Sequence, residues 1–148
     1  MILNLQNNFG KAVDASKTAK VAMKRGTFIK TNAGQWDIAT TLATTEGVLV
    51  RDVNAKDVDV AMGLPVSDFS TIQDTVLLGE YAGLEVIQKG ERHATTEFDA
   101  TLTDVQVADG QYLTITNGKL ATSATATTVV ALGWVHVGVQ KLLGFKFV

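Results

Sequence analysis

Residues 110–137 read GQYLTITNGKLATSATATTVVALGWVHV, and residues 26–53 read GTFIKTNAGQWDIATTLATTEGVLVRDV. At a constant offset of 84 residues the two stretches align at these positions: Gly26 with Gly110, Phe28 with Tyr112, Ile29 with Leu113, Gly34 with Gly118 and Trp36 with Leu120. A stretch rich in Thr and Ala follows in both copies. Each copy then ends on a strand-like segment, residues 47–50 in the first and residues 133–136 in the second. The second segment begins two residues later than the offset of 84 would place it. The chain therefore uses one β unit twice.

Each copy of the unit predicts a β-hairpin. In the first copy, Asn-Ala-Gly at 32–34 separates two strand-like runs, which fits a three-residue loop with Gly34 at positive φ. In the second copy, Asn117 and Gly118 separate the runs. Asn-Gly favours a type I′ turn, because both central residues of that turn need a positive φ.

The rest of the chain has the composition and the turn signals of an all-β protein. Of its 148 residues, 46% are hydrophobic and 19% are charged, which is typical of a chain that folds around a core. Turn-forming residues recur about every eight to twelve residues, and no window of about twelve residues shows a helical stripe. We therefore predict an all-β fold, a compact barrel or sandwich of short antiparallel strands that contains the two related hairpin units. A single β domain is expected over residues 20–148, after an N-terminal arm.

Residues 1–19 are predicted to form that flexible arm, because polar residues interrupt any apolar period there. Residues 1–30 carry six basic groups and one acid, a net charge of +5, whereas residues 31–148 carry −7. A basic leading segment on an acidic body indicates a contact between two proteins or subunits, although lysines that only solvate an arm would give the same pattern. The contact residues that we predict are Lys11, Lys17, Lys20, Lys24 and Arg25.

The two tryptophans are candidates for an exposed contact or for the core. Trp134 lies in an apolar run, which favours core packing. Trp36 lies between Gln35 and Asp37, and these polar neighbours make it the better candidate for an exposed or interfacial contact. We therefore add Trp36 to the predicted partner-binding residues.

No catalytic or metal-binding motif is found in the sequence. There is no cysteine, and the two histidines, His93 and His136, lie far apart in strand-like runs, so no metal or cofactor is expected. Neither a nucleophile-elbow serine nor a phosphate-binding glycine loop occurs. The protein is therefore not expected to be an enzyme.

Nucleic acid and membrane are not expected as partners. The body of the chain is acidic, whereas phosphate polymers are bound by clustered Lys and Arg side chains. No signal peptide is expected at the N-terminus. The most apolar window, residues 129–148, contains Lys141 and Lys146, so we predict core strands there instead of a membrane-spanning helix.

A short arm precedes a cysteine-free body rich in Thr, Val and Gly. The stretches GTFI at 26–29, GEYAGLEV at 79–86 and GQYLTI at 110–115 punctuate that body. In these features the chain resembles the small capsid decoration (cement) proteins of tailed bacteriophages. The resemblance implies a compact β-barrel or β-sandwich on the outer shell, commonly a homotrimer whose terminal arm grips neighbouring coat subunits. It also implies a structural virion protein, made in the host cytoplasm, that binds the major capsid protein, stabilises the shell and has no catalytic residues.

Two other functions fit the same features. A tail-tube or head–tail joining subunit would also use β-sandwiches, arms and ring assembly, although such subunits commonly carry a helix packed on the sheet. A carbohydrate-binding module would use an aromatic stacking platform formed by Trp36, Tyr81, Tyr112 and Trp134. The sequence leaves these alternatives open, and it also leaves open whether the repeated units form one barrel or two lobes.

Overall fold

The computed structural model describes residues 2–4, 13–51 and 75–148, and within these ranges its regular secondary structure is almost entirely strand. In chain order the elements are β1 (Ile2–Asn4), β2 (Val13–Thr18), β3 (Met23–Lys24), β4 (Phe28–Asn32), β5 (Gln35–Ile38), the 3₁₀ turn η1 (Leu42–Thr44), β6 (Gly47–Arg51), β7 (Thr75–Val76), β8 (Tyr81–Glu85), β9 (Arg92–Thr95), β10 (Tyr112–Thr116), β11 (Lys119–Thr122), β12 (Val129–Val137) and β13 (Gln140–Phe147). The predicted all-β class is confirmed.

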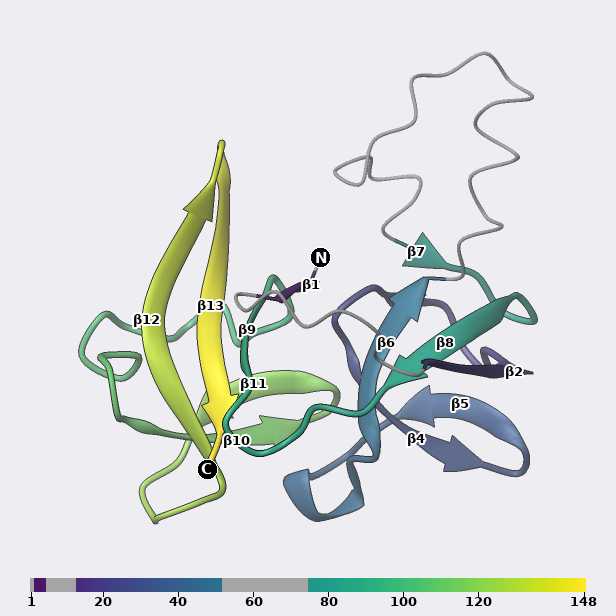
Figure 1. The fold of residues 1–148 in the computed structure, drawn as a ribbon, viewed down its shortest axis with the longest axis horizontal. Coiled ribbons are helices and arrows are strands. Elements are labelled where there is room, and N and C mark those ends of the chain that lie inside the picture. Colours follow the sequence, from purple (N-terminus) through teal and green to yellow (C-terminus); the bar gives the residue numbers. More distant parts are fainter. Residues whose placement is uncertain (1, 5–12, 52–74) are drawn as a thin grey trace.

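The strands form two small barrels, which lie side by side in Figure 1. In the first barrel the strand order is β2-β8-β6-β4-β5, and a parallel bridge from Ala19 to Trp36 joins the two edges. In the second barrel the order is β9-β13-β12-β10-β11, and a parallel bridge from Phe98 to Leu120 joins the edges. The short strand β1 adds to β9, and β3 pairs with β7 as a separate ribbon.

The two barrels have the same topology, and their registers agree except at the irregularities in β2 and β12. In both, the first strand pairs with the fifth, the fifth with the fourth, the fourth with the second and the second with the third. Phe28 faces Val48 in the first barrel, and the aligned Tyr112 faces Val130 in the second. The predicted repeat of hairpin units is therefore confirmed, and it is part of a larger duplication that includes all five strands of each barrel.

One detail of the predicted alignment is wrong. Gly47 and Gly133 were expected to correspond, but Ile29 faces Gly47 while the aligned Leu113 faces Val129. Glycine is required at the two positions for different reasons. At Gly47 a Cβ would lie 2.5 Å from the Glu85 carbonyl oxygen, whereas Gly133 has a φ of +87° at a bulge in β12.

The first hairpin turn also differs from its prediction. Asn32 pairs directly with Gln35, so the turn has two central residues, and these are Ala33 with φ +50° and Gly34 with φ +77°. The second turn has the same form, with Asn117 at +48° and Gly118 at +76°. Both values in each turn are positive, which is the signature of a type I′ turn.

The register assigns equivalent side chains to the two buried cores. Those of the first barrel are Ala19, Ile29, Trp36, Leu49 and Leu84, and their counterparts in the second are Phe98, Leu113, Leu120, Ala131 and Phe145. Large and small side chains compensate for one another. Leu49 and Leu84 face each other in the first barrel, and their counterparts in the second are the smaller Ala131 and the larger Phe145. Each core is therefore filled by a different combination of side chains on the same backbone plan.

The barrels are joined by the β10–β11 turn, which inserts into the first barrel between β4 and the segment after β5. The Phe28 N–H donates to the Gly118 carbonyl at 3.0 Å, and the Gly118 N–H donates to the Ala39 carbonyl at 2.7 Å. The Asn117 N–H donates to the Thr40 carbonyl at 3.2 Å. Beside this contact the Phe28 ring packs edge-on against Phe145, with ring centroids 5.5 Å apart. The junction is thus an extended backbone contact next to a shared apolar cluster.

The predicted arm, residues 1–19, needs correction where the structure describes it. Ile2–Asn4 pairs with β9, and Val13–Thr18 is the first strand of the first barrel. The strand was missed because its sequence, VDASKT, is polar and its register shifts between Asp14 and Lys17. An edge strand with a bulge loses the alternation on which strand prediction depends.

Candidate interaction site

Four of the five predicted basic contact residues lie in β2, in β3 and in the turns that directly follow these strands, and we call this part of the molecule the rim. Lys17 faces Ala82 across β2 and β8, and Lys24 faces Thr75 across β3 and β7. Lys24 is exposed, whereas Arg25 is half-buried in the turn that follows it. The remaining predicted contact, Lys11, lies outside the described residues.

Two of these lysines are held by acidic groups of the same molecule. Lys17 Nζ lies 3.1 Å from Asp14 Oδ2 and 4.1 Å from the centroid of the Trp36 ring. Lys20 Nζ lies 3.5 Å from Asp37 Oδ2. Because each positive charge has a negative neighbour, this rim is less basic than the sequence count alone suggests.

Hydrogen bonds keep both acidic partners ionised. The Ser16 hydroxyl and backbone N–H donate to Asp14, and together with Lys17 they lower the pKa of Asp14 to about 2. The Asn32 side chain donates to Asp37 at 2.8 Å and is the largest cause of a lowered pKa there. Both carboxylates therefore keep their negative charge to a lower pH than a free Asp side chain does.

The prediction that Trp36 is an exposed contact is wrong. The side chain is 1% exposed, and its Nε1 donates to the Ala82 carbonyl at 2.8 Å inside the first barrel. Its neighbours Gln35 and Asp37 are polar because successive residues of a strand point to opposite faces. A core residue in a strand with one buried face therefore normally has polar neighbours in the sequence.

The exposed feature at this rim is apolar, and we call Leu77, Leu78 and Tyr81 the apolar turn. Their exposed fractions are 55%, 69% and 62%. The turn is held in place by backbone hydrogen bonds from Gly79 N–H to the Ala19 carbonyl and from Ala19 N–H to the Glu80 carbonyl, each 2.8 Å. Exposed apolar side chains on a fixed turn beside lysines fit a protein-binding surface.

Sequence reasoning did not find the apolar turn. Residues 75–78 form a short apolar run, and such a run is normally assigned to a buried strand. The available signal was Gly79, which has a φ of +82° in the turn that follows Leu77 and Leu78. Local sequence does not distinguish that turn from the continuation of a strand.

Trp134 is only partly buried, and polar groups restrain it. Its Nε1 donates to Asp104 Oδ1 at 2.8 Å, and Lys141 Nζ lies 3.6 Å from its ring centroid. Its ring centroid is 5.1 Å from that of Phe98. The aromatic residues of the carbohydrate alternative are spread over both barrels, with Trp36 buried and the Trp134 ring covered by a lysine.

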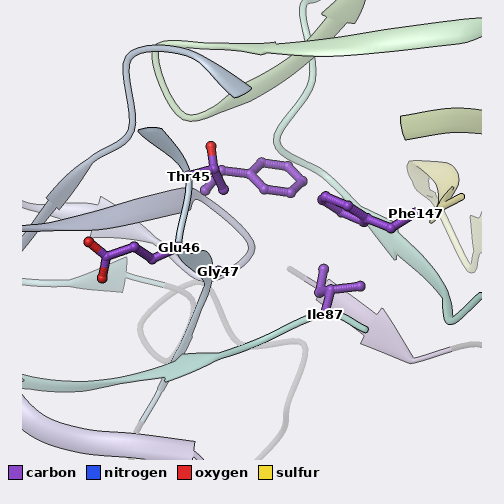
Figure 2. Close-up of a pocket in the computed structure, with 6 residues that line it drawn as sticks. Thr45, Glu46, Gly47, Ile87 and Phe147 are labelled. Carbon is purple, nitrogen blue, oxygen red and sulfur yellow. The ribbon is translucent and has the colours of Figure 1, made fainter. Parts of the chain in front are cut away.

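A small pocket of about 120 Å³ lies between the barrels, lined by Phe28, Thr45, Glu46, Gly47, Ile87 and Phe147. Figure 2 shows Ile87 and Phe147 directed into the space, while the Glu46 carboxylate points away from it. That carboxylate accepts hydrogen bonds from the Thr31 N–H at 2.9 Å and hydroxyl at 2.8 Å. The pocket therefore has mixed apolar and polar walls, and the Glu46 carboxylate is not directed at its contents.

The two histidines lie in different surroundings. His93 is 1% exposed, with Nε2 at 3.4 Å from Glu91 Oε2 and its ring 5.9 Å from that of Phe145, whereas His136 is on the surface. Within residues 2–4, 13–51 and 75–148, no group of three or more His, Asp or Glu side chains is placed to hold a metal ion. In the same ranges no helix is long and apolar enough to span a membrane.

Comparison of the chain with protein-family models, with curated proteins and with solved structures finds no match.

Proposed function

We propose that the protein is a structural binding protein of a virion, a decoration protein that attaches to the major capsid protein on the outside of a phage shell. The observation that carries this proposal is the apolar turn, which hydrogen bonds fix to the first barrel near Lys17, Lys20 and Lys24. A protein that binds a repeating shell needs a stable body and a modest contact surface, because symmetry multiplies each weak contact.

The carbohydrate alternative has less support. A stacking platform needs aromatic faces that are exposed together, and Trp36 is buried while Lys141 covers the Trp134 ring. A tail-tube or head–tail joining subunit remains the alternative proposal, since such proteins also assemble from small β units.

The proposal is tested by binding to purified shells of the virus that encodes the chain. The triple variant Leu77→Ser, Leu78→Ser and Tyr81→Ser removes the apolar turn without touching either buried core. We expect its affinity for shells to fall by about tenfold or more, because exposed apolar anchors supply most of the binding energy of small interfaces.

Val139→Ser is the matched control, since Val139 is a fully exposed apolar residue in the β12–β13 turn of the second barrel. The control chain should bind shells as the unmodified chain does. Equal shell occupancy by all three chains would reject the apolar turn as the contact, and no occupancy by the unmodified chain would reject the decoration function.

A further inference from the structure

The junction between the barrels contains a docking contact that the duplication repeats. We call residues 32–35 and 116–119 the first and second tips, because they are the turns of the two equivalent hairpins. The first notch is formed by the Phe28 N–H and the carbonyls of Ala39 and Thr40, which bind the second tip. The equivalent second notch consists of the Tyr112 N–H and the carbonyls of Ser123 and Ala124.

The first tip is free to make the same contact. Gly34 has a φ of +77°, as Gly118 has +76°, so the two tips present their backbone groups in the same way. A Cβ on Gly34 would meet no atom within 4 Å, whereas one on Gly118 would lie 2.6 Å from Thr27 Cγ2. In Figure 1 the β10–β11 hairpin runs toward the first barrel, and the β4–β5 hairpin runs away from the second.

The second notch has the form of the first. Ser123 N–H donates to the Tyr112 carbonyl at 3.0 Å, as Ala39 N–H donates to the Phe28 carbonyl at 3.0 Å. In the first notch the Phe28 N–H donates to the Gly118 carbonyl of the second tip at 3.0 Å. Phe28 is 0% exposed at the junction, and Tyr112 is 42% exposed.

We infer that the chain associates with further copies of itself head to tail, with the first tip of one copy docked in the second notch of the next. The Gly34 N–H then donates to the Ser123 carbonyl, and the Tyr112 N–H donates to the Gly34 carbonyl. The partner is a second copy, because the contact between the barrels joins the equivalent tip and notch of the same duplicated unit. Such a heterologous contact closes into a ring or extends as a filament.

The inference does not depend on capsid binding, and its first test is the mass of the protein in solution. Gly34→Asn places a side chain where the docked tip has no room, and Asn tolerates positive φ, so the hairpin keeps its form. We expect the unmodified chain to form oligomers and the variant to dissociate about tenfold more readily or to be monomeric. Gly138→Asn is the control, because Gly138 has a φ of +58° and equally open surroundings.

A second test traps the contact directly, because the chain has no native cysteine. A mixture of the Ala33→Cys chain and the Ala124→Cys chain should oxidise to the mixed covalent dimer in preference to either like-with-like dimer. The chain with Thr40→Cys and Asn117→Cys is the positive control, since the Asn117 N–H binds the Thr40 carbonyl within one molecule.

A strict monomer at all concentrations would overturn the inference, and so would an oligomer that Gly34→Asn leaves intact. Loss of the oligomer in Gly34→Asn, with the control unchanged and the mixed dimer formed, is the expected result. A closed ring or a tube seen in that case would also favour the joining-subunit or tail-tube alternative over shell decoration.

Discussion

Trp36 in β5 and Leu120 in β11 occupy the same position in the two barrels, and each forms the parallel bridge that closes its own barrel. Trp36 bridges Ala19, whereas Leu120 bridges Phe98. The first barrel thus combines a very large side chain with a very small one, and the second combines two of intermediate size. Both barrels close through the same bridge, but the two bridging side chains divide the core volume between them differently in each barrel.

This exchange predicts a measurable coupling between the two closing positions. Trp36→Leu should lower the free energy of unfolding by about 3 kcal/mol, because it removes a buried ring and its hydrogen bond to the Ala82 carbonyl. Ala19→Phe alone should also destabilise the protein, because it overfills the same space. The double variant should recover at least about 1 kcal/mol relative to the sum of the two single changes.

Urea denaturation of the four chains gives the coupling energy. The matched control combines Trp36→Leu with Val21→Phe, since Val21 is exposed near the same barrel end and is not at the closing bridge. Additive effects for the Ala19 pair would contradict the proposed equivalence of the two closing sites.

The strand class and the hairpins could be predicted from the sequence because their signals are local. Alternating residues and turn residues lie within about ten positions of one another, and the offset of 84 residues relates β4 and β5 to β10 and β11 without error. The same offset does not relate β6 to β12, which are the fourth strands of the two barrels. The connection that precedes them differs in length between the barrels.

The remaining features depend on contacts between distant parts of the chain. β2 was missed because its partner β8 lies far along the sequence and its own pattern is polar. Trp36 was assigned to the surface because its polar neighbours were taken to share its environment, although strand neighbours face the other way. The apolar turn and the two notches arise from tertiary placement, which local composition does not encode.

Ala33 provides a test of backbone strain in the first tip. It has a φ of +50°, a conformation that costs a residue with a Cβ about 1 kcal/mol and that Asn tolerates better. Ala33→Asn should therefore raise the free energy of unfolding by about 0.5–1 kcal/mol. Asn117→Ala, the reverse change in the second tip, should lower it by a similar amount, and a loss of stability in Ala33→Asn would contradict the assignment of a type I′ turn.

Asp14 predicts an acid-dependent contribution to stability. Hydrogen bonds from Ser16 and the nearby Lys17 lower its folded pKa from 3.8 to about 2, so the unfolded chain binds the proton more readily. The contribution is therefore complete above the unfolded value and is lost as the pH falls from about 4 through 2. Asp14→Asn should show less loss of stability in that interval, and carboxyl carbon shifts in NMR should place the Asp14 midpoint near pH 2. A midpoint near 3.8 would show that the Ser16 hydrogen bonds do not hold in solution.

Gly34 and Gly118 allow the strain of a turn to be separated from the contact between the barrels. Both have positive φ, so an Ala at either position costs about 1 kcal/mol of backbone strain. At Gly118 the new Cβ would also lie 2.6 Å from Thr27 Cγ2 and 2.8 Å from Ile38 Cγ2, so the junction must open. Gly118→Ala should cost about 2–4 kcal/mol in total, measured by denaturation at a dilution where the chain is monomeric. Equal costs for Gly34→Ala and Gly118→Ala would show that the barrels are not held together by the second tip, because only the contact distinguishes the two positions.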